Sequence, residues 1–157
     1  MDFEKHLLVD GSNVVHAWPE LRSLAKRDRE AARSRLSLAL RALHDAERVR
    51  VSLVFDGRGA ELAIERPAGA ATFLHAYSPA GLTADDVIEQ WVGRSREPGR
   101  CVVATDDRAE RETIAALGAA GISAAELAQW VERVAGRQQE GLARRRRAND
   151  RDWRRPG

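Results

Sequence analysis

Three short apolar runs in this chain each end in aspartate, and this repeated pattern constrains the fold more than any other feature. The runs are Leu7–Val9, followed by Asp10; Val51–Phe55, followed by Asp56; and Cys101–Thr105, followed by Asp106 and Asp107. Short apolar runs bounded by turn residues are typical of buried strands. Each predicted strand therefore carries a carboxylate to its C-terminal end.

Helical patterns separate the predicted strands. Asp28 is placed to cap a helix that reaches about Ala46, and further helices are predicted to begin at Thr83, Asp107 and Ser123. Additional strands are predicted over 72–77 and, briefly, over 122–123, whereas the glycine-rich segment 57–71 is predicted to be a long connection. Strands that alternate with helices predict an α/β fold with a mostly parallel sheet covered on both faces.

The length and the charge distribution predict one domain with a basic extension. Residues 1–136 fit a single domain, and residues 137–157 form an arginine-rich C-terminal tail or helix extension. The extension holds eight arginines against three acidic residues, a net charge of +5, so the remainder carries −3. We interpret the basic extension as a contact for RNA phosphates, with a solvated terminus as the alternative. The candidate residues are Arg144, Arg145, Arg146 and Arg147.

A cytoplasmic location without a membrane partner is expected. The single cysteine, Cys101, excludes an intrachain disulfide, which suits a reducing compartment. The first residues lack the basic and apolar pattern of a secretory signal, and no apolar run approaches the length of a membrane span.

The carboxylates predict a metal site at one edge of the sheet. Parallel strands end at the same edge, where ligands bind, so Asp10, Asp56, Asp106 and Asp107 are expected to meet there. Asp85 and Asp86 lie at a helix start that can face this edge. Crowded carboxylates repel each other unless cations lie between them, and oxygen ligands favour Mg²⁺ or Mn²⁺. Metal ions held in this way suit phosphodiester hydrolysis by an activated water.

Each carboxylate also has a purely structural interpretation. Asp10 and Asp56 both precede glycine and fit simple turns, and Asp86 is best explained as the acid of a capping box with Thr83. Asp107 fits a helix cap, with Glu110 completing a box. What these interpretations explain poorly is the occurrence of three strand-ending aspartates at the same predicted edge.

Two small polar residues follow Asp10. Asn13 is expected either to cap a helix or to orient the site, and Ser12 to support the turn. Ser12 is not expected to be a nucleophile, because no neighbour would activate it.

Other phosphate-binding folds fit the residues less well. A haloacid-dehalogenase-type phosphatase needs a second aspartate at position 12, which is Ser12, and a metal-dependent adhesion site needs serine at position 14, which is Val14. A receiver domain needs a lysine late in the sheet, but no lysine follows Lys26. The first turn also lacks the Gly-x-Gly-x-x-Gly pattern of dinucleotide-binding domains.

Four sequence blocks together resemble the YacP-like NYN domains, a branch of the PIN-like nucleases. The opening block is Leu8–Val14, closely followed by Ala17–Leu21 with its Trp-Pro pair. The later blocks match in the same order and are Val54–Gly57, Thr83–Asp85 and Val103–Arg108. The resemblance spans about residues 7 to 135.

The resemblance implies a three-layer Rossmann-like PIN fold and Mg²⁺- or Mn²⁺-dependent endoribonuclease activity, in some members on messenger RNA at the ribosome. By position, Asp10, Asp85 and Asp107 correspond to the acidic metal-binding residues of the family, with Asp56, Asp86 and Asp106 as support and with Asn13 and Ser12 beside the site. Asp106 stands where the family often has serine, which leaves open whether Asp106 or Asp107 binds metal. The implied products carry a 5′-phosphate and a 3′-hydroxyl.

A non-catalytic RNA-binding module on the same fold is the alternative, because spacing alone does not prove turnover. Cleavage of RNA in the presence of Mn²⁺ or Mg²⁺ distinguishes the two.

Overall fold

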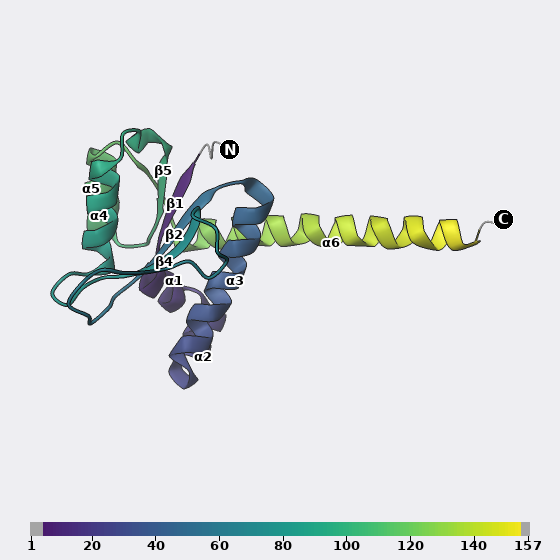
Figure 1. The fold of residues 1–157 in the computed structure, drawn as a ribbon, viewed down its shortest axis with the longest axis horizontal. Helices are drawn as coiled ribbons and strands as arrows, with labels where there is room; N and C mark the ends of the chain where they lie inside the picture. Colours follow the sequence, from purple (N-terminus) through teal and green to yellow (C-terminus); the bar gives the residue numbers. More distant parts are fainter. Residues whose placement is uncertain (1–4, 155–157) are drawn as a thin grey trace.

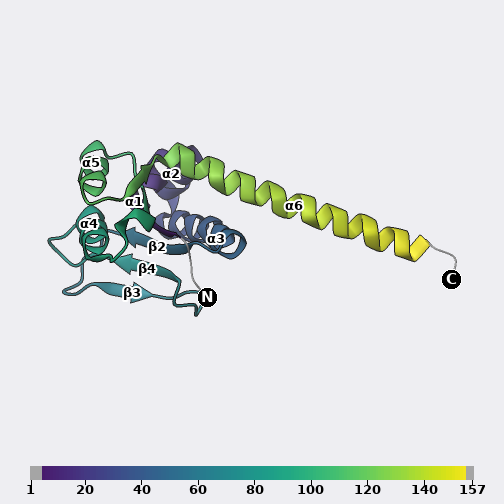
Figure 2. The same ribbon diagram turned by 90° about the horizontal axis from the view of Figure 1, so that it is seen from above.

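A six-stranded sheet forms the centre of the molecule (Figures 1 and 2). The computed structural model describes residues 5–154, with side chains up to residue 149. The strand order is β3-β4-β2-β1-β5-β6, and only β3 runs antiparallel to its neighbour. The strands are β1 (His6–Asp10), β2 (Arg50–Phe55), β3 (Ala63–Glu65), β4 (Phe73–Tyr77), β5 (Cys101–Ala104) and β6 (Ala120–Ile122).

Strand β1 is the middle of the arrangement that positions the site. It pairs with β2 on one side and β5 on the other, so the three strands that end near aspartates are immediate neighbours. Leu7, Leu8 and Val9 are all fully buried, because both faces of the sheet are covered. This explains why β1 reads as a continuous apolar run rather than as an alternating one.

Helices cover both faces of the sheet. One face packs against α1 (Gly11–Ala17), α2 (Pro19–Arg27), α3 (Arg29–Glu47) and the first part of α6 (Ala124–Arg154). The other face packs against α4 (Ala84–Arg94) and α5 (Arg108–Ala116). A short 3₁₀ helix, η1 (Pro98–Arg100), precedes β5. The predicted three-layer α/β fold with a mostly parallel sheet is thus confirmed.

Local capping signals fix where several helices begin. The Asp28 carboxylate accepts a hydrogen bond from the Ala31 amide at 3.1 Å and caps α3 as predicted. Thr83 and Asp86 form the predicted capping box of α4. At the start of α6, Ser123 and Glu126 accept hydrogen bonds from each other's backbone amides at 3.0 and 3.1 Å. These ends depend on residues close in sequence, which is why they are predictable.

Two strands differ from the prediction. The connection 57–71 contains β3, whose residues are exposed and pair with β4 through the backbone, for example Ile64 with Ala76. An exposed edge strand of this kind leaves no burial pattern in the sequence. The last strand occupies Ala120–Ile122 rather than 122–123, because Ser123 is already committed to capping α6.

Helix α6 continues far beyond the body of the domain (Figures 1 and 2). Among the residues up to 149, Val134 is the last buried residue of α6, and all residues from 142 to 149 are exposed. The arginine run therefore lies on a helix extension rather than on an irregular tail. Of the two predicted segments, 1–136 and 137–157, residues 1–4 and 155–157 lie outside the described part. In the described part, no helix is long and apolar enough to cross a bilayer.

Candidate metal centre

Asp10 ends β1 at the carboxyl edge of the sheet and also starts α1. Its side chain accepts a hydrogen bond from the Asn13 amide at 3.3 Å, and the residue is almost completely buried. The chain enters the helix at Gly11 without a spacer. A Cβ at Gly11 would lie 2.3 Å from a ring carbon of Phe55, so only glycine fits between Asp10 and this ring.

Asp85 lies in the first turn of α4, and the end of β2 fixes that turn. The Asp56 carboxylate accepts a hydrogen bond from the Ala84 amide at 2.7 Å, which ties the start of α4 to the strand edge. The capping box of Thr83 and Asp86 holds the same turn from the other side. Asp85 itself is half-buried and is left to face the neighbouring carboxylates.

Glu110 supplies the third carboxylate, from the first turn of α5. Asp107 caps this helix by accepting a hydrogen bond from the Glu110 amide at 3.1 Å. The Glu110 side chain turns inward and is only 1% exposed. One carboxylate oxygen from each of Asp10, Asp85 and Glu110 lies within 4.8 Å of the others.

The electrostatics of this cluster favour a bound cation. Burial raises the pKa of Asp10, and the nearby Asp85 carboxylate raises it further. Burial likewise raises the pKa of Glu110, reinforced by Asp85 and by the charge of Asp10, while the Thr105 side chain acts in the opposite sense. Within the described residues, neither Glu110 oxygen has a hydrogen-bond partner. Three crowded carboxylates, two of them almost fully buried and one without a hydrogen bond, are a donor set that Mg²⁺ or Mn²⁺ takes, so the residues fit such an ion.

The remaining predicted acids accept hydrogen bonds from backbone amides around this edge of the sheet. Asp106 accepts a hydrogen bond from the Ala124 amide of α6 at 2.9 Å, just as Asp56 and Asp86 hold α4. Asp107 is exposed at the cap of α5. The structure thus brings Asp10 and Asp85 together, with Glu110 as the third member, and surrounds them with acids that fix helix starts.

Asn13 and Ser12 take different positions beside the cluster. The Asn13 side-chain oxygen accepts a hydrogen bond from the Asp106 amide at 2.9 Å, so Asn13 connects α1 to the loop after β5. Asn13 does not cap α1, because Asp10 is the N-cap of that helix. Ser12 instead lines a cavity between α1, α2 and α3.

The sequence predicts only a capping-box role for Glu110 and no role for Glu89. The box is not closed, because the Asp107 amide donates to the Thr105 hydroxyl at 3.1 Å. Glu110 lies four residues before the buried Ile114, and this helical spacing is the signal that points it inward. Glu89 borders the cluster, where burial followed by the charges of Asp85, Asp86 and Asp107 raises its pKa.

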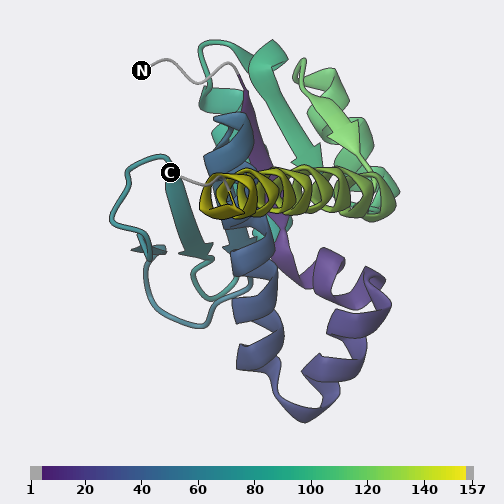
Figure 3. The ribbon, with the colours of Figure 1, turned by 90° about the vertical axis from the view of Figure 1, so that its right-hand side faces the viewer.

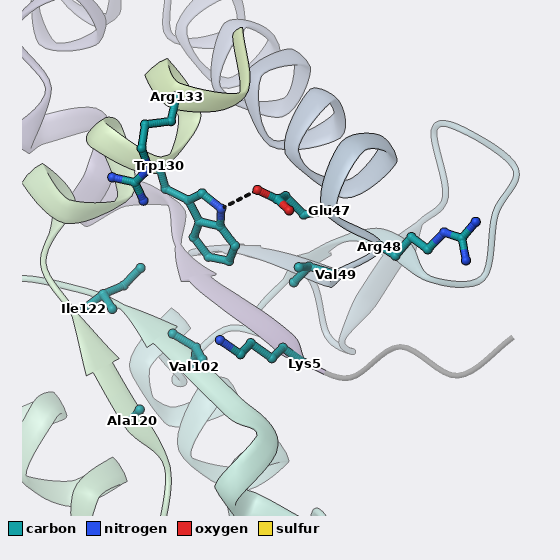
Figure 4. A pocket seen from close by; sticks show the side chains of 9 residues that line it. All are labelled: Lys5, Glu47, Arg48, Val49, Val102, Ala120, Ile122, Trp130 and Arg133. Atoms are coloured by element: carbon teal, nitrogen blue, oxygen red, sulfur yellow. Dashed lines mark hydrogen bonds between the residues drawn. The ribbon is translucent and has the colours of Figure 1, made fainter. Parts of the chain in front are cut away.

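A larger cavity, of about 770 Å³, lies at the opposite edge of the sheet (Figure 4). Its walls include Lys5 before β1, Val49 before β2 and Ala120 at the start of β6. The Trp130 indole N–H donates to Glu47 at 3.4 Å inside it. The carboxylate cluster is at the carboxyl ends of the strands, so this cavity is separate from it.

Comparisons with known proteins agree with this geometry. The family model described as YacP-like NYN domain matches residues 7–155. A crystal structure of Rae1 (YacP) from Bacillus subtilis superimposes with a TM-score of 0.74 and 29% identity, over 97% of this chain and 85% of that one. A mutant form of the same protein gives a TM-score of 0.76 and 28% identity, over 89% of this chain and 82% of that one. No curated protein matches the sequence.

Proposed function

Because this chain belongs to the YacP-like NYN domain family, whose fold is that of PIN-like nucleases, we propose that it is a metal-dependent endoribonuclease. The observation that carries the proposal is the cluster of Asp10, Asp85 and Glu110 at the carboxyl edge of the sheet. Its ligands are all carboxylates, and two of them are almost fully buried. RNA is the proposed substrate, and RNA at the ribosome is the target that the family resemblance implies for some members.

In this proposal Asp10, Asp85 and Glu110 hold the ion. A bound Mg²⁺ or Mn²⁺ would supply a polarised water and positive charge for the scissile phosphate. The chain's own contribution is to fix the three carboxylates before the substrate arrives. Asp56 secures the turn that carries Asp85, and Asn13 with Asp106 joins α1, the β5 loop and α6.

Asp107, a family-implied metal ligand, is proposed here to act beside the cluster. Its Oδ1 accepts a hydrogen bond from the Glu110 amide, and its negative charge contributes to the raised pKa of Glu89. We propose that Asp107 positions Glu110 and adds negative charge at the rim. Under this assignment Glu110→Gln weakens Mn²⁺ binding more than Asp107→Asn does, as measured by isothermal titration.

Cleavage of a short single-stranded RNA tests the activity. We expect the wild-type protein to cut in Mn²⁺ or Mg²⁺ and not in EDTA, leaving a 5′-phosphate and a 3′-hydroxyl. Asp85→Asn should abolish cleavage, whereas Glu112→Gln, which removes an exposed carboxylate from α5, should retain it. RNA binding without any cleavage by the wild-type protein would favour the non-catalytic alternative.

The basic part of α6 is proposed to bind RNA at a position distant from the carboxylate cluster. Arg145 and Arg146 are exposed and make no ion pair with any residue that the structure describes, while Arg144 pairs weakly with Glu140 at 3.7 Å. Four arginines that each displace a cation from single-stranded RNA predict a salt slope of about 3. Replacing Arg144–Arg147 by glutamine should lower the salt slope by about 3 while the Mn²⁺ affinity stays unchanged. An unchanged slope would refute the role of this segment.

The proposed RNA substrate and the single buried cysteine, Cys101, agree with a cytoplasmic location.

A further inference from the structure

A basic groove lies beside the carboxylate cluster, between α1, α2 and α3. The groove has a volume of about 530 Å³. Arg22 and Lys26 from α2 and Arg29 and Arg33 from α3 line it, and these four residues are called the basic groove below. Helix α2 and the first half of α3 extend past the carboxyl ends of the strands as a hairpin (Figure 3), so the groove lies on the same side as the cluster.

The groove is lined by residues that border the proposed metal centre, although the three carboxylates of the cluster are not part of its lining. Its lining also includes Ser12, two residues after Asp10. Asp56 lines it as well and binds the Ala84 amide, next to Asp85. A ligand that fills the groove therefore lies at the carboxyl edge of the sheet, against residues close in sequence to Asp10 or hydrogen-bonded next to Asp85.

Three of the four cations make no charge-pairing contact within the described part of the protein. Within the described residues, Arg22, Lys26 and Arg29 are exposed and form no ion pair. Arg22 and Lys26 are four residues apart on one helix, and Arg29 and Arg33 are four residues apart on the next. Like charges at this spacing face each other and destabilise a helix. An anionic ligand in the groove would relieve this repulsion.

Arg33 differs from the other three because its guanidinium is held in place. The guanidinium carbon lies 4.6 Å from the centre of the Phe55 ring and 6.0 Å from that of Tyr77. Its side chain is only 20% exposed, and Glu30 lies 3.6 Å from it. A guanidinium stacked in this way keeps its N–H edges directed outward for phosphate oxygens. The Phe55 ring that supports it is the same ring that packs against Gly11 beside Asp10.

We propose that the basic groove binds the phosphodiester backbone of single-stranded RNA immediately beside the scissile bond. This inference rests on the proposed nuclease function, because the position of the scissile bond is taken from the carboxylate cluster at the same edge of the sheet. The four cations are spread over two helices, which suits an extended polyanion better than one compact anion. The arginine run of α6 projects away from this side of the body (Figures 1 and 2), so the groove is a separate contact.

The test compares two matched triple variants. One combines R22Q, K26Q and R29Q, and leaves Arg33 and its ring contacts intact. The control combines R41Q, R94Q and R96Q, which removes three exposed arginines at or near the far ends of α3 and α4. Thermal unfolding checks that both fold, and the single variant K26Q replaces the triple variant if the latter does not.

Binding of a short single-stranded RNA is measured by fluorescence anisotropy on an Asp85→Asn background, so that no cleavage interferes. Loss of three phosphate contacts predicts a salt slope lower by about 2 in the groove variant, with no such change in the control. In Mn²⁺-dependent cleavage the groove variant should show a KM raised about tenfold and a kcat within about twofold of wild type. Methylphosphonate linkages beside the cleavage site should weaken wild-type binding and leave the groove variant unaffected.

The inference is overturned if the groove variant and the control bind RNA equally and with the same salt slope. It is also overturned if the groove variant loses affinity for an acidic peptide but not for RNA. If the wild-type protein binds RNA through the groove but never cleaves it, the nuclease proposal fails while the groove assignment stands.

Discussion

Glu110→Gln is the most informative single change, because it preserves side-chain size and removes one charge from the cluster. In the metal-free protein the cluster repels itself, and burial together with Asp10 and Asp85 favours the protonated form of Glu110. The substitution should therefore stabilise the metal-free protein. In the presence of Mn²⁺ it should have the opposite effect, because a proposed ligand is lost.

The size of the effect follows from the cost of keeping a carboxyl group protonated. At pH 7.5 a group with an ordinary pKa of about 4.5 must hold its proton about three units above that value, which costs about 4 kcal/mol at most. The buried glutamine amide offsets part of this gain, because the Glu110 oxygens make no hydrogen bond within the described residues, and an unpartnered buried polar group costs about 1–3 kcal/mol. A net gain of about 2 kcal/mol corresponds to a Tm rise of about 4–8 °C for a domain of this size.

Thermal unfolding with EDTA and with Mn²⁺ measures both effects. We expect Mn²⁺ to raise the Tm of the wild-type protein and to leave that of Glu110→Gln nearly unchanged. Glu112→Gln is the control, because that exposed carboxylate pairs only with Arg108 at 3.5 Å. It should leave the free energy of unfolding, with EDTA and with Mn²⁺, within about 1 kcal/mol of the wild-type value.

The pH dependence of stability gives a second check on the prediction that Glu110→Gln stabilises the metal-free protein. Because the pKa of Glu110 is raised on folding, the native state keeps a proton that the unfolded state releases, and stability falls as pH rises above about 4.5. The advantage of Glu110→Gln in EDTA should therefore shrink between pH 8 and pH 5. A variant that is less stable than wild type in EDTA, yet keeps its full Mn²⁺ response, would refute the assignment of Glu110.

Three further predictions concern the surroundings of the cluster. Gly11→Ala places a methyl group 2.3 Å from the Phe55 ring and should cost about 1–3 kcal/mol of unfolding free energy, measured by urea denaturation, while an unchanged midpoint would contradict the tight turn. Asp106→Ala removes the cap on the Ala124 amide and should cost about 1 kcal/mol while retaining the Mn²⁺-induced rise in Tm, so that loss of this rise would instead make Asp106 a ligand. Burial and then Arg50 lower the pKa of His6 to about 4, so the native state resists a proton that the unfolded state takes up, and stability should fall as pH drops from about 6.5 to 4. His6→Gln should make this fall in stability with pH less steep, and an unchanged steepness would show that His6 is not its cause.

Helix and strand positions were largely predictable because their signals are local. The capping boxes of Thr83 with Asp86 and of Ser123 with Glu126 each join residues three apart, and both form as predicted. The buried strands read directly as apolar runs. The short edge strand β3 is not predictable in this way, because its residues are exposed and its pairing depends on a distant strand.

The sequence by itself determined that aspartates follow the strands of an α/β sheet, since strand periodicity and the turn after each strand are properties of neighbouring residues. Only the tertiary structure decided which carboxylates meet. Asp56 and Asp106 accept hydrogen bonds from amides 28 and 18 residues away, while Glu110, which looked like a capping acid, turns inward to Asp10 and Asp85. That choice depends on the order β2-β1-β5 and on which face of α5 is buried. Both are set by packing between segments far apart in the chain.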